Sequence, residues 1–288
     1  MVSKACRESY IAGCNREHKD KCCESMEDHI QSMLKKYRSL DEGVKSAISK
    51  AYEMIVEAIR ATFSIDENVK NISPLIKCDP VEIVIAFHDL GKCTKKNQES
   101  LRKRCTAPYH EIISAASLYA FSVSIDRKFG LISALPHIIA ILLHHHSMRS
   151  IKDIINKASR DKLYWDNDSE NMVECAKISL RVNCPDLTPY IANPTWISNI
   201  PKYISELPKI ISVMEKPRGT NRNNLYYLVY RGAVMITGII SILDRYAASI
   251  NRWCGKISEE DLDRDVKEYL RRRRAYMEAS RALSIGGS

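Results

Sequence analysis

Apolar residues recur every three to four positions along most of this 288-residue chain. In segment 26–37, Met26, Ile30, Met33 and Tyr37 would lie on one face of an α-helix. The same rhythm returns in segments 46–63, 80–92, 107–125, 131–146 and 223–253. No segment shows the sustained two-residue alternation of a half-buried strand. The fold is therefore predicted to be all-α, as a helical bundle.

Two prolines suggest where helices begin. Pro80 suits the first turn of a helix with Asp79 as its N-cap, and Gly91 suits the end of that helix. A second helix is expected to start after Pro136.

Residues 149–223 interrupt the helical pattern, because five prolines fall between positions 182 and 209. We predict an irregular, proline-rich insertion with short helices that could pack over the functional site. The remaining chain divides into an N-terminal cysteine-rich extension (1–23), a main domain (24–255) and a C-terminal basic helix and tail (256–288).

The formal net charge is +9 and the pI is near 9.0, which favours an anionic partner such as nucleic acid. Basic residues cluster in segments 92–104 and 269–281. Either cluster could also be a solvated helix face.

The chain has no apparent secretory signal, since its first 30 residues are charged and contain cysteines. The apolar stretches 131–143 and 232–243 are short for a bilayer span. We therefore expect a cytoplasmic protein without membrane association.

Ten cysteines are many for such a protein. Cys6, Cys14, Cys22 and Cys23, with His18, could form a small zinc site, although they lack the C-x2-C pairs of common zinc modules. The alternatives are buried thiols or, in a hyperthermophile, disulfides. The chain contains only two glutamines, which favours a hyperthermophilic source.

The chemistry-bearing residues centre on "AFHDLGK", residues 86–92. Asp89 ends an apolar run, and a buried carboxylate survives only if it is paired, hydrogen-bonded or bound to metal. Three consecutive histidines, His144 to His146, end a second apolar helix. Imidazole and carboxylate are ligands that transition metals prefer. His137, alone on an apolar face, is interpreted as a satisfied core residue.

The motif "HDLGK" resembles the signature of the HD superfamily of metal-dependent phosphohydrolases. The order of the other groups strengthens the resemblance over residues 24–255: "EDHI" with His29, then His110, "HHH" at 144–146, and "ILDRYA" with Asp244. The pattern is most similar to the stand-alone HD nuclease subunit of archaeal type I CRISPR interference systems. No phosphate loop of a helicase is found in the chain.

The resemblance implies a set of metal ligands. His29, His88, Asp89 and Asp244 would hold one metal, and Asp89 would bridge to a second one held by His110, His144 and His145. His146 could replace His144 or His145, because consecutive side chains on a helix cannot all point one way. Lys92 is expected to neutralise charge on the reacting phosphate. Asp244 is carried over by position, and an ordinary ion pair with its neighbours is its alternative role.

The implied function is a nuclease that hydrolyses phosphodiester bonds of single-stranded DNA in antiviral defence, with RNA and duplex substrates left open. Its cofactors would be two divalent ions among Mn, Ni, Co, Fe, Zn and Mg. Its partners would be a separate helicase subunit and an RNA-guided surveillance complex. The alternatives are an HD phosphohydrolase that acts on nucleotides (a dNTPase or a cyclic-nucleotide phosphodiesterase) and a scaffold subunit whose histidines are core groups.

Overall fold

The structure is a computed structural model. It describes residues 10–14, 23–62, 74–145, 169–180, 184–192, 194–214, 222–252 and residue 264. His146, His18, most of the N-terminal extension, segment 146–168 and nearly all of the C-terminal basic region lie outside this part of the chain.

The prediction of an all-α bundle is confirmed. Two short strands, β1 (Ile11–Cys14) and β2 (Cys23–Ser25), pair antiparallel and were not predicted. The longer helices are α2 (Met26–Arg38), α3 (Glu42–Thr62), α4 (Pro80–Phe87), α5 (Lys95–Arg104), α6 (His110–Ile125), α7 (Gly130–Leu143), α9 (Ser169–Ser179), α11 (Ile200–Met214) and α12 (Arg222–Asn251). Shorter elements are the 3₁₀ helices η1 (Pro74–Lys77), η2 (Leu90–Cys93), η3 (Pro185–Leu187) and η4 (Thr195–Asn199), and the helix α10 (Thr188–Ala192).

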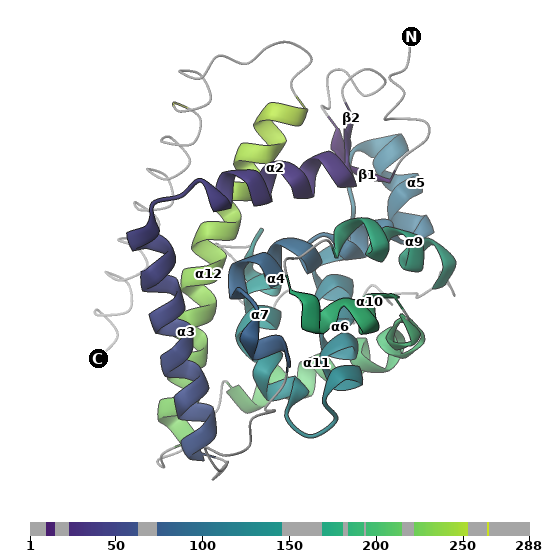
Figure 1. Cartoon of the computed structure of the whole chain (residues 1–288). Coiled ribbons are helices and arrows are strands. Elements are labelled where there is room, and N and C mark those ends of the chain that lie inside the picture. Colours follow the sequence, from purple (N-terminus) through teal and green to yellow (C-terminus); the bar gives the residue numbers. More distant parts are fainter. Residues whose placement is uncertain are drawn as a thin grey trace, which may run out of the picture.

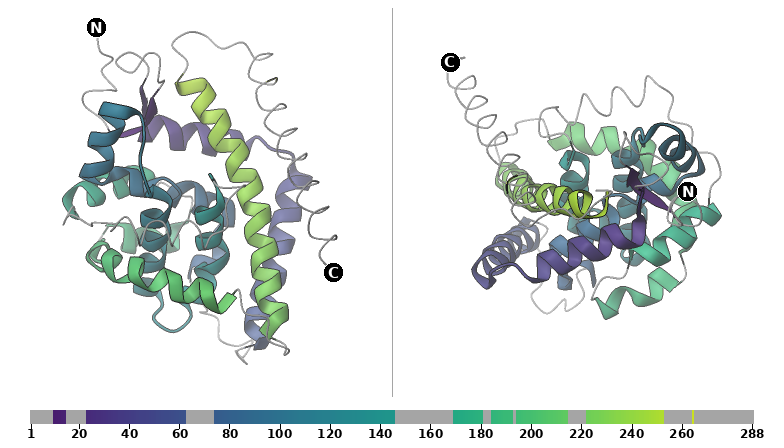
Figure 2. Two further views of the ribbon diagram at one scale, coloured as in Figure 1. Left: turned by 180° about the vertical axis from the view of Figure 1, so that it is seen from behind. Right: turned by 90° about the horizontal axis from the view of Figure 1, so that it is seen from above.

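The long helix α12 organises the bundle. It lies beside α3 and also packs against α7, while α2 crosses its C-terminal half (Figures 1 and 2). Its buried face includes Val229, Ala233, Ile236, Ile240 and Leu243. Residues Tyr227–Asn251 have the length and apolar composition needed to cross a membrane, so the expectation that no stretch is long enough was wrong. Packing against three neighbouring helices accounts for this apolar character equally well.

The helix that carries the "HDLGK" motif is capped as predicted but ends earlier than predicted. Asp79 is the N-cap of α4, and its Oδ1 accepts hydrogen bonds from the N–H groups of Val81 at 2.8 Å and Glu82 at 3.1 Å. The α-helix ends at Phe87, and Gly91 lies in η2 instead. The second start was also wrong, because α7 begins at Gly130 and contains Pro136 in its interior.

The predicted insertion is more helical than its prolines suggested. Pro201 and Pro208 are accommodated within the fifteen-residue α11. Trp196 in η4 and Leu207 in α11 are buried in the same hydrophobic core as α4 and α6. The described part of this segment is therefore an integral layer of the bundle.

Three disulfides fasten the segment that carries the motif. Their pairs are Cys14–Cys105, Cys78–Cys184 and Cys93–Cys175. Cys23 is also disulfide-bonded. Since Cys14 and Cys23 are both oxidised, the suggested zinc site in the N-terminal extension loses two of its ligands and was wrong in that form. The disulfide alternative is confirmed for these residues.

Candidate metal centre

The predicted ligands come from five separate elements and converge on one place. His29 lies on α2, His110 begins α6 and Asp244 lies on α12. His88 and Asp89 occupy the turn between α4 and η2, and His144 and His145 follow the last residue of α7. The ligand atoms form two groups of four, in each of which all lie within 4.8 Å of one another: Asp89, His110, His144, His145; and His29, His88, Asp89, Asp244. These buried groups could hold a metal ion.

Asp89 belongs to both groups because its two oxygens face opposite ways. Oδ2 lies 3.4 Å from Nε2 of His29 and 3.4 Å from Nε2 of His88. Oδ1 lies 3.4 Å from Nε2 of His110 and 3.9 Å from Nε2 of His144. The side chain of Asp89 is fully buried, so bulk water does not solvate its carboxylate.

The histidine rings are oriented by hydrogen bonds at their other nitrogens. Nδ1 of His88 donates to the carbonyl of Ile85 at 2.8 Å, and Nδ1 of His144 donates to that of Ile141 at 2.5 Å. Both acceptors lie in the last turn of a helix, where carbonyls lack intrahelical partners. Nδ1 of His110 donates to the carbonyl of Ala107 at 2.6 Å. Since a carbonyl can only accept, Nδ1 keeps its proton and Nε2 is the atom left for a metal.

His110 and His144 are uncharged at neutral pH. Burial lowers the pKa of His110, and burial followed by the neighbouring His88 lowers the pKa of His144 to about 3. Neutral imidazole is the form that binds metal. Within the described part of the chain, Nε2 of His110, Nε2 of His144 and Oδ1 of Asp89 are buried without any hydrogen-bond partner. Three lone-pair atoms that face each other in this way call for a cation, so these residues fit a metal ion.

The group around His29 is compensated differently. Burial alone would raise the pKa of Asp89, but the charges of His88 and Lys92 outweigh burial and hold this pKa well below its usual range. Burial would lower the pKa of His88, yet Asp89 outweighs it and the net shift is upward. The ammonium of Lys92 lies 2.5 Å from Oδ2 of Asp89 and is itself buried. In the metal-free chain, the proton bound by His88 and the ammonium of Lys92 therefore offset the negative charge of Asp89.

Asp244 and His145 form the more accessible side of the site. Oδ1 of Asp244 lies 3.4 Å from Nε2 of His29, and its Oδ2 lies 3.7 Å from Nδ1 of His145. The exposed fractions of these side chains are 15% for Asp244 and 32% for His145, whereas His29, His88 and His144 are fully enclosed. The group is therefore most accessible at the edge formed by His145 and Asp244.

Gly91 brings the two halves of the site together. A Cβ atom at this position would overlap the carbonyl oxygen of His110 and crowd Ile113. Its N–H also donates to Oγ of Ser114 at 2.8 Å. The absence of a side chain lets the loop after Asp89 lie directly on the first turn of α6.

One residue of the site, Glu24, was not predicted from the sequence. This buried carboxylate accepts a 2.6 Å hydrogen bond from Nδ1 of His29 through Oε1. Arg252 donates to its Oε2 at 2.6 Å, and Asn251 donates to its Oε1 at 3.1 Å. Burial alone would raise the pKa of Glu24, but His29 and Arg252 outweigh it and lower this pKa to about 2. In many metalloproteins, a carboxylate accepts a hydrogen bond from a histidine that binds the metal through its other nitrogen. The carboxylate orients the histidine ring in this way.

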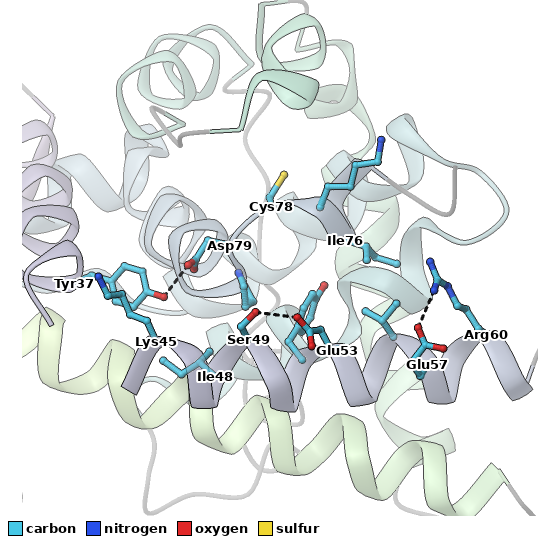
Figure 3. Close-up of a pocket in the computed structure, with 14 residues that line it drawn as sticks. Tyr37, Lys45, Ile48, Ser49, Glu53, Glu57, Arg60, Ile76, Cys78 and Asp79 are labelled. Carbon is cyan, nitrogen blue, oxygen red and sulfur yellow. Dashed lines mark hydrogen bonds and ion pairs between the residues drawn. The ribbon is translucent and has the colours of Figure 1, made fainter. Parts of the chain in front are cut away.

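A cavity of about 500 Å³ lies elsewhere, between α3, η1 and the start of α4 (Figure 3). Its wall includes Tyr37, Lys45, Tyr52 and Asp79, and none of the predicted ligands lines it. Asp79 caps the N-terminus of α4, whereas His88 caps its C-terminus. The cavity and the metal centre are thus at opposite ends of the same helix.

A scan against models of known protein families found no match, and neither did searches of curated proteins and of solved structures. The function must therefore be inferred from the residues of the site.

Proposed function

We propose that this protein is a metal-dependent nuclease of the HD type that hydrolyses phosphodiester bonds in single-stranded DNA, with two divalent ions as cofactors. The observation that carries the proposal is the carboxylate of Asp89, whose Oδ2 faces His29 and His88 while Oδ1 faces His110 and His144. A carboxylate with separate ligand groups on its two oxygens suits a bridge between two metals.

Two bound cations would activate a shared water and stabilise the leaving oxygen of a phosphodiester. The role of the chain is to hold this arrangement ready. The Nδ1 bonds of His29, His88, His110 and His144 fix the rings before metal binds. The Lys92 ammonium keeps Asp89 ionised and adds positive charge beside the reacting phosphate.

The ligand set is rich in imidazole, which favours Mn, Fe, Co, Ni or Zn over Mg alone. The net charge of +9 supports a polyanionic substrate. On the resemblance to the CRISPR nucleases, we propose a cytoplasmic protein that works with a separate helicase subunit and an RNA-guided complex. RNA and duplex DNA are further substrates to be assayed.

The decisive variant is Asp89→Asn, which keeps the size of the side chain but removes the charge that both metals would share. Cleavage of an end-labelled oligonucleotide is measured with each of Mn²⁺, Ni²⁺, Co²⁺ and Zn²⁺, and circular dichroism verifies the fold. We expect Asp89→Asn to abolish cleavage. Glu57→Gln is the matched control, because it removes one carboxylate charge from the exposed face of α3. An Asp89→Asn variant that cuts as fast as the parent would refute the proposal.

The alternative HD activity, on nucleotides, calls for an enclosed pocket for a base beside the metal centre. The cavity described above lies at the other end of α4, so it would not serve as that pocket. The same assay includes a mixture of dNTPs and cyclic nucleotides. Hydrolysis of these compounds without cleavage of the oligonucleotide would select the alternative.

A further inference from the structure

The helix α5 presents a strongly basic surface immediately after the site loop. Its ten residues carry five basic side chains, all exposed, and a single acidic one, Glu99. The basic residues are Lys95, Lys96, Arg102, Lys103 and Arg104. The opposite face, with Asn97, Gln98 and Leu101, is buried against the protein. A net positive charge gathered on one exposed helix face attracts anions.

The helix is fixed to the metal centre by several bonds. Nε2 of Gln98 donates to the carbonyl of Lys92 at 2.9 Å and to that of Ile11 at 3.0 Å. Nδ2 of Asn97 donates to the carbonyl of Gly91 at 2.8 Å. At the far end of the helix, the disulfide from Cys105 ties it to β1. The basic face therefore has one fixed position relative to the site.

The chain also limits how far this face lies from the ligands. Lys95 follows Lys92 by three residues, and Arg104 precedes His110 by six. At about 3.5 Å per residue, these connections reach at most roughly 10 Å and 20 Å. A polynucleotide bound at the metal centre is therefore long enough to contact α5.

The composition of the face distinguishes among anionic partners. A protein interface has an apolar or aromatic centre, and a membrane-bound helix inserts an apolar face. The exposed positions of α5 carry only charged groups and one partly exposed serine, Ser100, and its apolar Leu101 faces the core. Contacts of this kind suit a sugar–phosphate backbone, which is held by Lys and Arg without regard to base sequence.

We propose that α5 is a docking surface for the phosphate backbone of the single-stranded nucleic acid whose cleavage is proposed above, and that it guides the strand to the metal centre. This inference depends on the proposed function for its biological meaning, but its binding test is independent of cleavage. Each cation that contacts a phosphate of a single strand contributes about 0.7 to the slope of log K against log salt concentration.

The test uses the full-length protein in EDTA, where metal-dependent cleavage is absent. Binding of a fluorescein-labelled oligothymidylate is followed by anisotropy between 50 and 200 mM salt. The variant Lys95→Ala/Lys96→Ala/Arg102→Ala/Lys103→Ala is expected to bind more weakly, with a slope shallower by up to about 2.8. The matched control, Lys35→Ala/Lys50→Ala/Lys202→Ala/Lys209→Ala, removes the same charge from exposed positions on α2, α3 and α11. We expect the control to keep a slope close to that of the parent.

A second measurement separates docking from chemistry. Hydrolysis of bis(p-nitrophenyl) phosphate with Mn²⁺ should be equal in the α5 variant and the parent, because this small diester has no polynucleotide backbone for α5 to hold. The parent and both variants could all fail to hydrolyse this diester while only the α5 variant shows a shallower slope of log K against log salt concentration. In that case the nuclease proposal fails and the docking surface stands. Equal slopes for the α5 variant and the control, or no oligonucleotide binding by the parent, would overturn the docking surface.

Discussion

Glu24 offers the sharpest test of the metal centre, because it touches no proposed metal and acts only through His29. The substitution Glu24→Gln preserves the shape of the side chain. Its amide oxygen can still accept from Nδ1 of His29, but its NH₂ group then faces Nε of Arg252, which is also a donor. The change therefore weakens the hydrogen bond that orients His29 and removes the charge that increases its basicity.

The size of the effect follows from the type of contact. Removal of a hydrogen-bonding partner of a metal-binding histidine typically lowers metal affinity about 10–100-fold. This range corresponds to about 1.4–2.7 kcal/mol of binding free energy. Because Glu24 is buried and shared by three donors, we expect a result in the upper half of this range.

The assay is calorimetric titration of Mn²⁺ into the purified protein at neutral pH. The control, Glu27→Gln, loses a carboxylate from α2, the helix that carries His29, but this carboxylate contacts the solvent-exposed Gln31 instead of a ligand. Near-UV circular dichroism in EDTA establishes that both variants keep their tertiary packing. If Glu24→Gln binds Mn²⁺ as tightly as Glu27→Gln does, the idea that Glu24 orients a metal ligand is wrong.

Two further predictions concern stability. Burial lowers the pKa of His137 to about 4, whereas the pKa of an unfolded histidine is near 6.5. Between these two pH values, only the unfolded state binds a proton at this residue. The free energy of unfolding therefore falls as the pH falls from 6.5 to about 4. Between pH 7 and pH 5, His137 should lower the free energy of unfolding of the parent by about 2 kcal/mol. Urea denaturation should therefore show that acidification destabilises His137→Leu by about 2 kcal/mol less than the parent. Equal losses of stability in the two proteins would contradict the lowered pKa of His137. The paired substitution Cys93→Ser/Cys175→Ser opens a covalent loop with a sequence separation of 82; a chain-entropy argument predicts a loss of about 4 kcal/mol, measured by denaturation under non-reducing conditions, and an unchanged midpoint would show that this cross-link does not restrict the unfolded chain.

The local features of the fold could be predicted from the sequence, because neighbouring residues determine them. The buried stripe of α2 (Met26, Ile30, Met33, Tyr37) follows from its spacing, and Asp79 caps α4 as expected. Pro136 misled the prediction, because a proline inside a helix is tolerated where packing of the surrounding helix outweighs the lost hydrogen bond.

The candidate site was predictable only where residue types themselves carried the chemistry. His29, His88, Asp89, His110, His144, His145 and Asp244 are brought together by the structure as the resemblance implied. Glu24 was not predictable: it lies in a strand of three residues, and its partner Arg252 is 228 positions away. His137 was expected to be satisfied, yet among the described residues neither of its buried ring nitrogens has a hydrogen-bond partner of good geometry. Such pairings depend on tertiary packing, which periodicity does not encode.

The three disulfides share a feature that bears on how the protein must be produced. Cys78, Cys93 and Cys105 fall just before α4, in η2 and after α5, so each of these three cross-links has one end in the segment that carries His88 and Asp89. Their partners come from β1, α9 and the start of η3, which are remote in the chain. A chain made in a reducing compartment would have to rely on noncovalent packing alone to hold this segment. Oxidation after that packing has formed would lock it in place, whereas premature pairing of wrong cysteines would trap chains that never assemble a centre.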